Sequence, residues 1–328
     1  MRHVRFLLLL AGLGGLVFLV VRIGPASLAA AFAQVRWWQF LLVCLPYGLI
    51  MVVDTLGWRY AFRYDRAPFH RLLGARMAGD ALNVATALAS VGGEAMKAWL
   101  IRRDVPYEES VPALVVAKTT ATVSQALFLI VGIVLALAAL PLQSHVVRIM
   151  LWLLVVEVVA VGGFFLVQVT GLVRRGGRLL RWFGMADGPS HADRLDRALR
   201  EYYRRDWRRF ALSTGFHFLG WLLGAVETYL MLVVLDVGIP LVTATVIEAF
   251  GSAVRFASFL VPASIGALEG ANAAIFPGLG STGSAGLAFT LVRRGRQTVW
   301  IMIGLLTLVG MRFHASLRAR RAPARSVS

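Results

Sequence analysis

The 328-residue chain is too apolar to be one soluble globular domain. Its residues are 58% hydrophobic and its mean hydropathy is +0.72, so part of the apolar surface must face lipid. The formal net charge of +17 would suggest a nucleic-acid partner in a soluble protein, but here the arginines gather in short segments between apolar runs. We therefore expect an integral membrane protein whose partner is a phospholipid or another polar lipid, and no nucleic acid.

Six apolar runs approach the ~20 residues needed to cross ~30 Å of hydrocarbon. They are residues 6–21, 38–57, 111–139, 147–170, 210–235 and 285–312. The first run follows basic residues, as in a secretory signal peptide, and Ala31-Phe32-Ala33 resembles a cleavage site. That triplet lies well beyond the run and Arg22 intervenes, so an uncleaved anchor helix fits better.

Two further apolar stretches, 72–101 and 242–277, are interrupted by glycine, proline and charged residues. A continuous membrane span would be uniformly apolar, so these stretches are predicted to be re-entrant or broken helices. Irregular backbone at membrane depth is tolerated only where protein or a watery cavity satisfies its amides. Such segments typically border a transport pathway.

Basic segments predict the orientation of the chain. They occur at residues 2–5, 59–71, 174–209 and 312–321, and alternating spans place all four on one side of the membrane. By the positive-inside rule that side is the cytoplasm, so both termini are predicted to be cytoplasmic in a multi-pass inner (plasma) membrane protein. The segment 173–209 carries acidic residues and arginines at helical spacing. It indicates either a surface helix on anionic headgroups or a solvated loop.

The two broken stretches share a plan. Residues 79–94 resemble residues 251–269 once small gaps are allowed. The first of these two segments ends on Glu94 and the second on Glu269. The predicted orientation makes the first stretch enter from the cytoplasm and the second from outside, as inverted repeats do in transporters.

The expected fold class is an all-α integral membrane protein with about six transmembrane helices and two re-entrant or broken helical hairpins in inverted-topology repeats. We expect a single polytopic domain over residues 1–328. Its parts are a first repeat half at 38–139, a linking span and basic cytoplasmic loop at 140–209, a second repeat half at 210–312, and a basic cytoplasmic tail at 313–328.

Charged residues inside the apolar segments are the candidate functional residues. Lys118 lies about seven residues, or ~10 Å, into its span, where an isolated charge costs several kcal/mol. We expect such cations to line a lipid-headgroup pathway, with Glu94 and Glu269 as their counter-ions. The alternative is a structural ion pair that fastens the two halves together. The predicted pathway residues are Glu94, Lys97, Lys118, Arg255, Glu269, Arg293, Arg294 and Arg296.

Three more glutamates, Glu157, Glu227 and Glu248, lie within apolar segments. Each could carry a proton if burial favours its neutral form, but nothing in the sequence distinguishes one from another, so hydrogen bonding in helix packing is the default interpretation. The six histidines lack ligand spacing and no nucleophile elbow occurs. The sequence therefore leads us to expect no metal, no cofactor and no catalytic residues.

A resemblance to a known family is carried by the two broken stretches and the cations that follow them. The motifs are Gly92-Gly93-Glu94 followed by Lys97 and Leu100, Val115 to Lys118, and Pro262 to Gly270 followed by Arg293 or Arg294. They resemble the transmembrane domain of the lysylphosphatidylglycerol synthase/flippase superfamily, including stand-alone members associated with hopanoid lipids. The resemblance implies a bacterial inner-membrane protein that moves polar lipids between leaflets or toward the outer membrane.

Two departures from the family pattern limit what the resemblance implies. Lys97 and Lys118 stand where the family often carries arginine, which leaves the lipid headgroup open. Only a short basic segment follows Arg312, so the aminoacyl-transferase domain of the full synthases is not expected and lysine transfer is not predicted.

We interpret the sequence as that of a non-enzymatic, flippase-like lipid translocator. In this hypothesis a headgroup passes through a polar groove between the halves while its acyl chains stay in hydrocarbon. One alternative is a membrane-embedded lipid-modifying transferase, which would need a nucleophile or metal ligands at the membrane face. The other is a non-catalytic partner of a lipid-biosynthesis enzyme.

Overall fold

The computed structural model describes residue 21 and residues 36–85, 91–139, 144–170, 189–259 and 261–321. All regular elements in these ranges are helices, which confirms the predicted all-α class. The predicted first span lies outside the described residues, apart from Val21. The elements are α3 (Trp37–Ala61), α4 (Phe69–Ala85), α5 (Val91–Ile101), α6 (Tyr107–Ala139), α7 (His145–Thr170), α9 (Pro189–Arg205), α10 (Trp207–Val234), α11 (Leu241–Ala257), η1 (Pro262–Ser264), α12 (Ala267–Ile275), η2 (Pro277–Leu279) and α13 (Gly283–Arg321).

Four described helices, α3, α6, α7 and α10, are long and apolar enough to cross a membrane. They coincide with the predicted spans 38–57, 111–139, 147–170 and 210–235. The predicted span 285–312 lies inside the 39-residue helix α13, which is not among those four and carries three arginines in its first half. The protein is therefore a multi-pass membrane protein.

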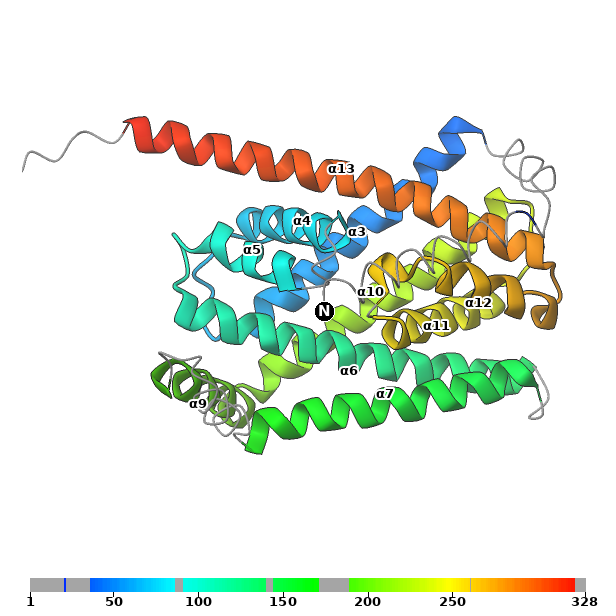
Figure 1. Ribbon diagram of the computed structural model, residues 1–328, viewed down its shortest axis with the longest axis horizontal. Helices are drawn as coiled ribbons and strands as arrows, with labels where there is room; N and C mark the ends of the chain where they lie inside the picture. Colours follow the sequence, from blue (N-terminus) through cyan, green and yellow to red (C-terminus); the bar gives the residue numbers. More distant parts are fainter. Residues whose placement is uncertain are drawn as a thin grey trace, which may run out of the picture.

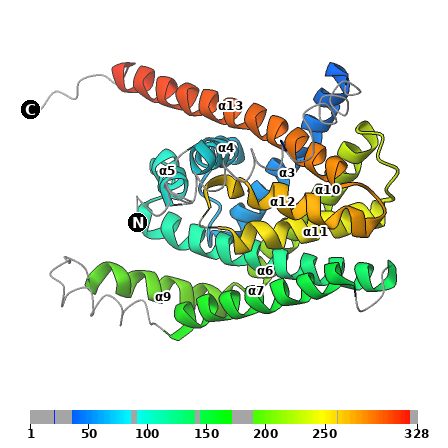
Figure 2. The ribbon, with the colours of Figure 1, turned by 45° about the vertical axis from the view of Figure 1, so that its right-hand side comes forward.

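The two predicted broken stretches form pairs of short helices. Within 72–101 the described helices are α4 and α5, of 17 and 11 residues, and within 242–277 the described α-helices are α11 and α12, of 17 and 9 residues. Each helix is shorter than the ~20 residues of a membrane span. In Figures 1 and 2, α4 and α5 lie toward the end of the molecule that holds α9, and α11 and α12 lie toward the opposite end. An inverted repeat requires this placement, while the repeat relationship itself stays a prediction.

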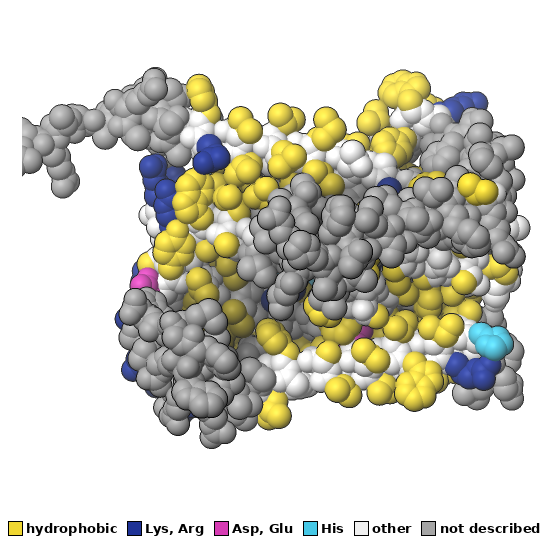
Figure 3. All heavy atoms as spheres, viewed as in Figure 1, with side chains coloured by type: hydrophobic (Ala, Val, Ile, Leu, Met, Phe, Trp, Pro, Cys, Tyr) yellow, Lys and Arg dark blue, Asp and Glu magenta, His cyan; other side chains and the backbone are white. Residues whose placement is uncertain are grey.

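The surface between the two ends of the molecule is largely apolar. On α7, Trp152 and Val159 are 72% and 69% exposed, and on α3 Leu45 is 67% exposed. Figure 3 shows hydrophobic side chains over the middle of the long axis and Lys and Arg side chains toward its two ends. This distribution is what a helical bundle in a bilayer needs, because lipid tails contact the middle and headgroups contact the ends.

Ion pairs fasten the end of the molecule where α9 lies. Arg63, after α3, contacts Glu201 at 2.9 Å and Asp206 at 3.0 Å, and Arg209 contacts Asp65 at 2.7 Å. The segment predicted as either a surface helix or a loop contains the helix α9. Its residues Leu199 and Tyr202 are buried, and the Tyr202 hydroxyl donates a 2.8 Å hydrogen bond to the carbonyl of Tyr60.

Two separate hydrophobic cores hold the described helices together. The core near α9 includes Trp58 of α3, Ile101 of α5 and Val116 of α6. The other core includes Phe128 of α6, Met231 of α10, Ile275 of α12 and several residues each of α7, α11 and α13. Because α3, α6 and α10 contribute to both cores, the residues between them along these helices form a layer of their own.

Candidate functional site

Buried hydroxyl groups occupy the layer between the two cores. Thr120 of α6 and Ser213 of α10 are hydrogen-bonded through their side chains at 2.8 Å, and Ser213 donates to the carbonyl of Gly57 in α3 at 2.8 Å. One turn further along α6, Ser124 donates to the carbonyl of Thr214 at 2.7 Å. Each of these three buried hydroxyl groups has a hydrogen-bond partner on another helix, so the layer is a specific polar contact and not a packing defect.

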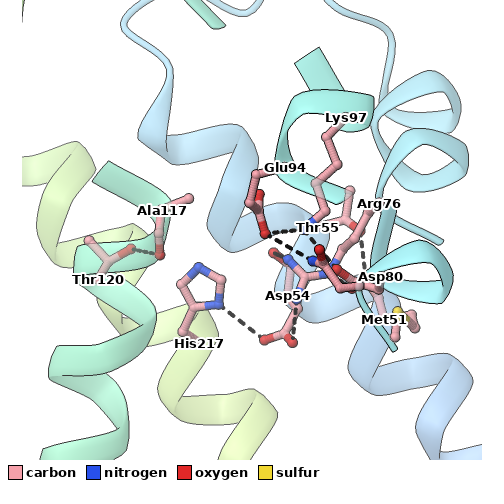
Figure 4. A network of polar contacts seen from close by, with 11 residues as sticks. Met51, Asp54, Thr55, Arg76, Asp80, Glu94, Lys97, Ala117, Thr120 and His217 are labelled. Atoms are coloured by element: carbon pink, nitrogen blue, oxygen red, sulfur yellow. Dashed lines mark hydrogen bonds and ion pairs between the residues drawn. The ribbon is translucent and has the colours of Figure 1, made fainter. Parts of the chain in front are cut away.

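Five charged side chains meet beside this layer and form the first-half cluster: Asp54, Arg76, Asp80, Glu94 and Lys97 (Figure 4). Arg76 contacts Asp54 at 2.9 Å and Asp80 at 3.4 Å. Lys97 contacts Asp80 at 2.7 Å and Glu94 at 2.9 Å. Helices α3, α4 and α5 thus each contribute at least one member, and α10 adds His217, whose Nδ1 lies 3.1 Å from the Asp54 carboxylate.

Close helix contacts position the first-half cluster. A Cβ atom on Gly79 of α4 would collide with the Lys97 side chain, and one on Gly57 of α3 would lie 2.8 Å from the His217 ring. The Asn83 side chain caps α5, since its Oδ1 accepts a 2.9 Å hydrogen bond from the Gly93 amide, which has no partner within the helix. Glycine and a cap therefore let two short helices pack tightly enough for their charges to meet.

The first-half cluster has an excess of negative charge and remains partly accessible. Three carboxylates face two cations. The side chains of Asp54, Asp80 and Glu94 are 21%, 25% and 29% exposed, whereas that of Lys97 is 7% exposed. A ligand that carries a cation or hydrogen-bond donors can therefore still reach the carboxylates.

Lys118 of α6 is placed differently from every other predicted pathway residue. It is exposed, forms no ion pair with a described residue, and lies within electrostatic range of Asp80. At 1.5 Å per residue it lies ~16 Å along α6 from Tyr107. Gln125, seven residues on and thus on the same helix face, donates a 2.9 Å hydrogen bond to the carbonyl of Ser252 in α11. Lys118 therefore lies on the α6 face that is directed at the second half.

Lys118 does not lie on the row of exposed apolar residues that runs along the later part of α6. The exposed apolar residues of the later part of the helix are Leu127, Ile130, Val134 and Leu137. At ~100° per residue these positions are rotated from Lys118 by roughly 100–180°. In this later part of α6 the exposed apolar residues therefore lie on another side of the helix than Lys118, whereas Val111, seven residues before Lys118, is exposed on the same side.

A second group of charges lies toward the opposite end of the molecule. This second-half cluster comprises Glu227, Glu248, Arg255, Arg293 and Arg296. Arg293 pairs with Glu248, which also contacts Arg255 at 2.8 Å, and Arg296 contacts Glu227 at 3.0 Å. Both glutamate side chains are at most 5% exposed, so their charges are held almost entirely by arginine.

Arg294 fastens the turn between α11 and α12. It donates from Nε to Glu269 at 2.9 Å and from Nη1 to the carbonyl of Ala263 at 2.6 Å. Ala263 and Ser264 both have φ of 50°, a conformation that is strained for residues with a side chain. Glu269 also accepts a 2.8 Å hydrogen bond from the Gly266 amide. These contacts hold the irregular turn in place.

The structure divides the predicted pathway residues among three places. Glu94 and Lys97 pair with each other in the first-half cluster, Arg255, Arg293 and Arg296 lie in the second-half cluster, and Glu269 pairs with Arg294. The expectation that Glu94 compensates Lys118 is corrected, since Glu94 contacts Lys97, three residues away on the same helix.

Other interpretations from the sequence are also corrected. Glu227 and Glu248 are ion-pair partners of α13 arginines and not merely helix-packing hydrogen bonders. The sequence patterns did not single out Asp54, Arg76 and His217 as site residues. A charge inside a predicted span was a usable signal for Asp54, because it lies in 38–57.

The fold and these clusters define a multi-pass helical membrane protein with paired charges in its interior and the exposed cation Lys118 part-way along the spanning helix α6. A comparison with protein families sharpens this class: the chain matches the family described as the lysylphosphatidylglycerol synthase TM region over residues 5–305. The chain belongs to this family, which gives it a lipid-related role in the membrane. No curated protein and no solved structure matches it.

Proposed function

We propose that this protein is a flippase-like lipid translocator, which moves a lipid with a polar or anionic headgroup across or out of the bacterial inner membrane without modifying it chemically. The observation that carries the proposal is Lys118, a cation exposed deep along a membrane-crossing helix with no ion-pair partner among the described residues.

An exposed ammonium group at this depth is costly unless water or an anion accompanies it. A phosphate-bearing headgroup supplies that anion. The partly exposed carboxylates Asp80 and Glu94 lie on the facing hairpin and suit the hydroxyl or ammonium groups that many headgroups also carry. A headgroup bound between Lys118 and these carboxylates would have its charge compensated inside the membrane, which lowers the barrier to crossing.

The polar face of α6 gives the headgroup a direction of travel. Thr122 and Gln125 follow Lys118 on the same face, and Gln125 contacts the backbone of α11. The proposed route therefore runs from the first-half cluster, along α6, toward the hairpin of the second half.

The test is lipid flipping by purified protein in vesicles that contain fluorescent phosphatidylglycerol, with bleaching of the outer leaflet as the readout. Lys118→Ala removes one charge-assisted contact of about 1.5–3 kcal/mol and should slow flipping about tenfold or more. Lys118→Arg keeps the charge and should retain most of the rate. Arg208→Ala, which removes an exposed cation at the start of α10, is the matched control and should leave the rate unchanged. A wild-type rate in Lys118→Ala, or no flipping by the wild-type protein, would refute the proposal.

A further inference from the structure

One ionisable side chain stands apart from both charged clusters. Glu157 of α7 is 0% exposed, and neither of its carboxylate oxygens has a hydrogen-bond partner in the described structure. Every other buried glutamate among the described residues, Glu227, Glu248 and Glu269, contacts an arginine. The sequence could not separate Glu157 from Glu227 and Glu248, but the structure does.

Glu157 lies at the middle of its helix. α7 runs from His145 to Thr170, so Glu157 is about 18 Å from the first residue and about 20 Å from the last. Since the hydrocarbon layer is ~30 Å thick, both helix ends reach headgroup depth and the carboxyl group is near the bilayer centre.

The buried side of α7 is apolar up to this residue. Val146, Val147, Met150 and Leu154 lie at helical spacing and pack into the hydrophobic core with α6 and α11. Glu157 is the next residue on that face, so the carboxyl group points into the bundle and not toward lipid.

No described charge on a neighbouring helix compensates Glu157. α7 packs against α6, α9 and α11. The charged groups there include Glu108, Glu109 and Lys118 of α6, and Glu248 and Arg255 of α11, and none of them, nor any described side chain of α9, pairs with Glu157. An unpaired carboxylate in such surroundings costs far more than a neutral carboxylic acid, so the group must bind a proton to remain there.

We propose that Glu157 is a proton-binding site at the centre of the membrane and that its occupation by a proton is coupled to lipid movement. The carboxylic acid is the form that fits the closed contact of α7 with α6 and α11. Loss of the proton creates a carboxylate that this contact cannot hold, so deprotonation favours separation of α7 from the core. The coupling rests on the proposed lipid translocation, and the proton site does not.

Chemical labelling tests the proton site without any transport. Dicyclohexylcarbodiimide adds to a protonated carboxyl group in apolar surroundings. Mass spectrometry of the purified protein should find the label on Glu157, with a labelled fraction that falls as the pH is raised. Glu227 and Glu248, which are paired with arginine, should stay unlabelled under the same conditions. A Glu157 that is unlabelled at every pH, or labelling equal at all three glutamates, overturns the proton site.

Stability gives a second measurement. Glu157→Gln replaces the neutral acid by a neutral amide of the same shape, so its unfolding midpoint in detergent should match that of the wild type at acidic pH, where the carboxyl group of the unfolded chain is protonated as well. The wild-type midpoint should fall as the pH is raised, and that of Glu157→Gln should not follow it. A marked loss of stability in Glu157→Gln at neutral pH contradicts a protonated side chain.

The coupling is tested by flipping in vesicles with and without an imposed pH gradient. The wild-type rate should change with the gradient, and the rate of Glu157→Gln should not respond to it. A wild-type rate that ignores the gradient overturns the coupling while leaving the proposed function intact. Absence of any flipping by the wild type overturns both, and the labelling result still decides the proton site.

Discussion

The first-half and second-half clusters contain the same kinds of side chain but differ in exposure. The carboxylates of the first-half cluster are between 21% and 29% exposed, whereas Glu227 and Glu248 in the second-half cluster are 3% and 5% exposed. The two clusters occupy comparable places in the chain. Lys97 lies on the second helix of the first broken hairpin, and Arg293 lies on the helix that follows the second broken hairpin. A shared mixture of acidic and basic side chains therefore does not mean an equal role.

The difference in exposure distinguishes carboxylates that a ligand can reach from carboxylates whose ion pairs hold helices together. In the second-half cluster α13 is joined to α10 through Arg296 and to α11 through Arg293, and both arginines are at most 11% exposed. A lipid headgroup cannot reach Arg293 or Arg296 without breaking an ion pair, whereas the side chain of Arg255 is 31% exposed. In the first-half cluster the carboxylates outnumber the cations and are partly exposed, which is why the proposed headgroup site lies there.

The strongest test of the fastening role is Arg296→Leu. It leaves Glu227 buried without its cation and should lower the free energy of unfolding by about 3–5 kcal/mol. Thermal unfolding in detergent can be followed with a thiol-reactive dye, because the protein has one cysteine, Cys44, and that cysteine is buried.

The matched control for this variant is the double change Arg296→Leu with Glu227→Leu. Replacing both partners removes the uncompensated charge and should restore most of the stability. If the single variant unfolds at the wild-type temperature, the second-half cluster does not fasten α13. The two clusters would then not differ in their contribution to stability.

Lys97→Met in the first-half cluster should cost less, about 1–3 kcal/mol, because Asp80 and Glu94 are partly exposed and can be hydrated when their cation is removed. Measured in the same unfolding assay, the loss should be clearly smaller than that of Arg296→Leu. A loss of equal size would mean that the two clusters are equally buried in the membrane.

The sequence predicts the helices of this fold better than the contacts between them. The four spanning helices follow from uninterrupted apolar runs, and interior cations such as Lys97 stand out because charge at that depth is rare. Asp54 and Arg76 lie on different helices and are 22 residues apart in the sequence, and Glu227 and Arg296 are 69 residues apart. Whether such residues meet is decided by close approaches, as at Gly57 against His217, which hydropathy does not encode.

The polar layer between the cores should be less sensitive than either cluster. Thr120→Val keeps the shape of the side chain but removes the hydrogen bond to Ser213, which still donates to the carbonyl of Gly57. The expected loss is about 0.5–1.5 kcal/mol in the free energy of unfolding. A loss as large as that of Lys97→Met would place the hydroxyl layer, and not the charges, at the centre of the fold.

Lys118→Ala should have the smallest effect on stability and therefore separates ligand contact from fastening most cleanly. Lys118 is exposed and has no ion-pair partner among the described residues, so its truncation should change the free energy of unfolding by no more than about 0.5 kcal/mol. The dye assay at Cys44 measures this change, and Arg208→Ala is the control for loss of one exposed cation. A charged side chain at ~16 Å along a spanning helix loses hydration, and Lys118 gains no ion pair in return. If Lys118→Ala leaves the stability unchanged but slows flipping, Lys118 therefore acts on the lipid headgroup. A loss of more than about 2 kcal/mol would instead make it part of the fastening.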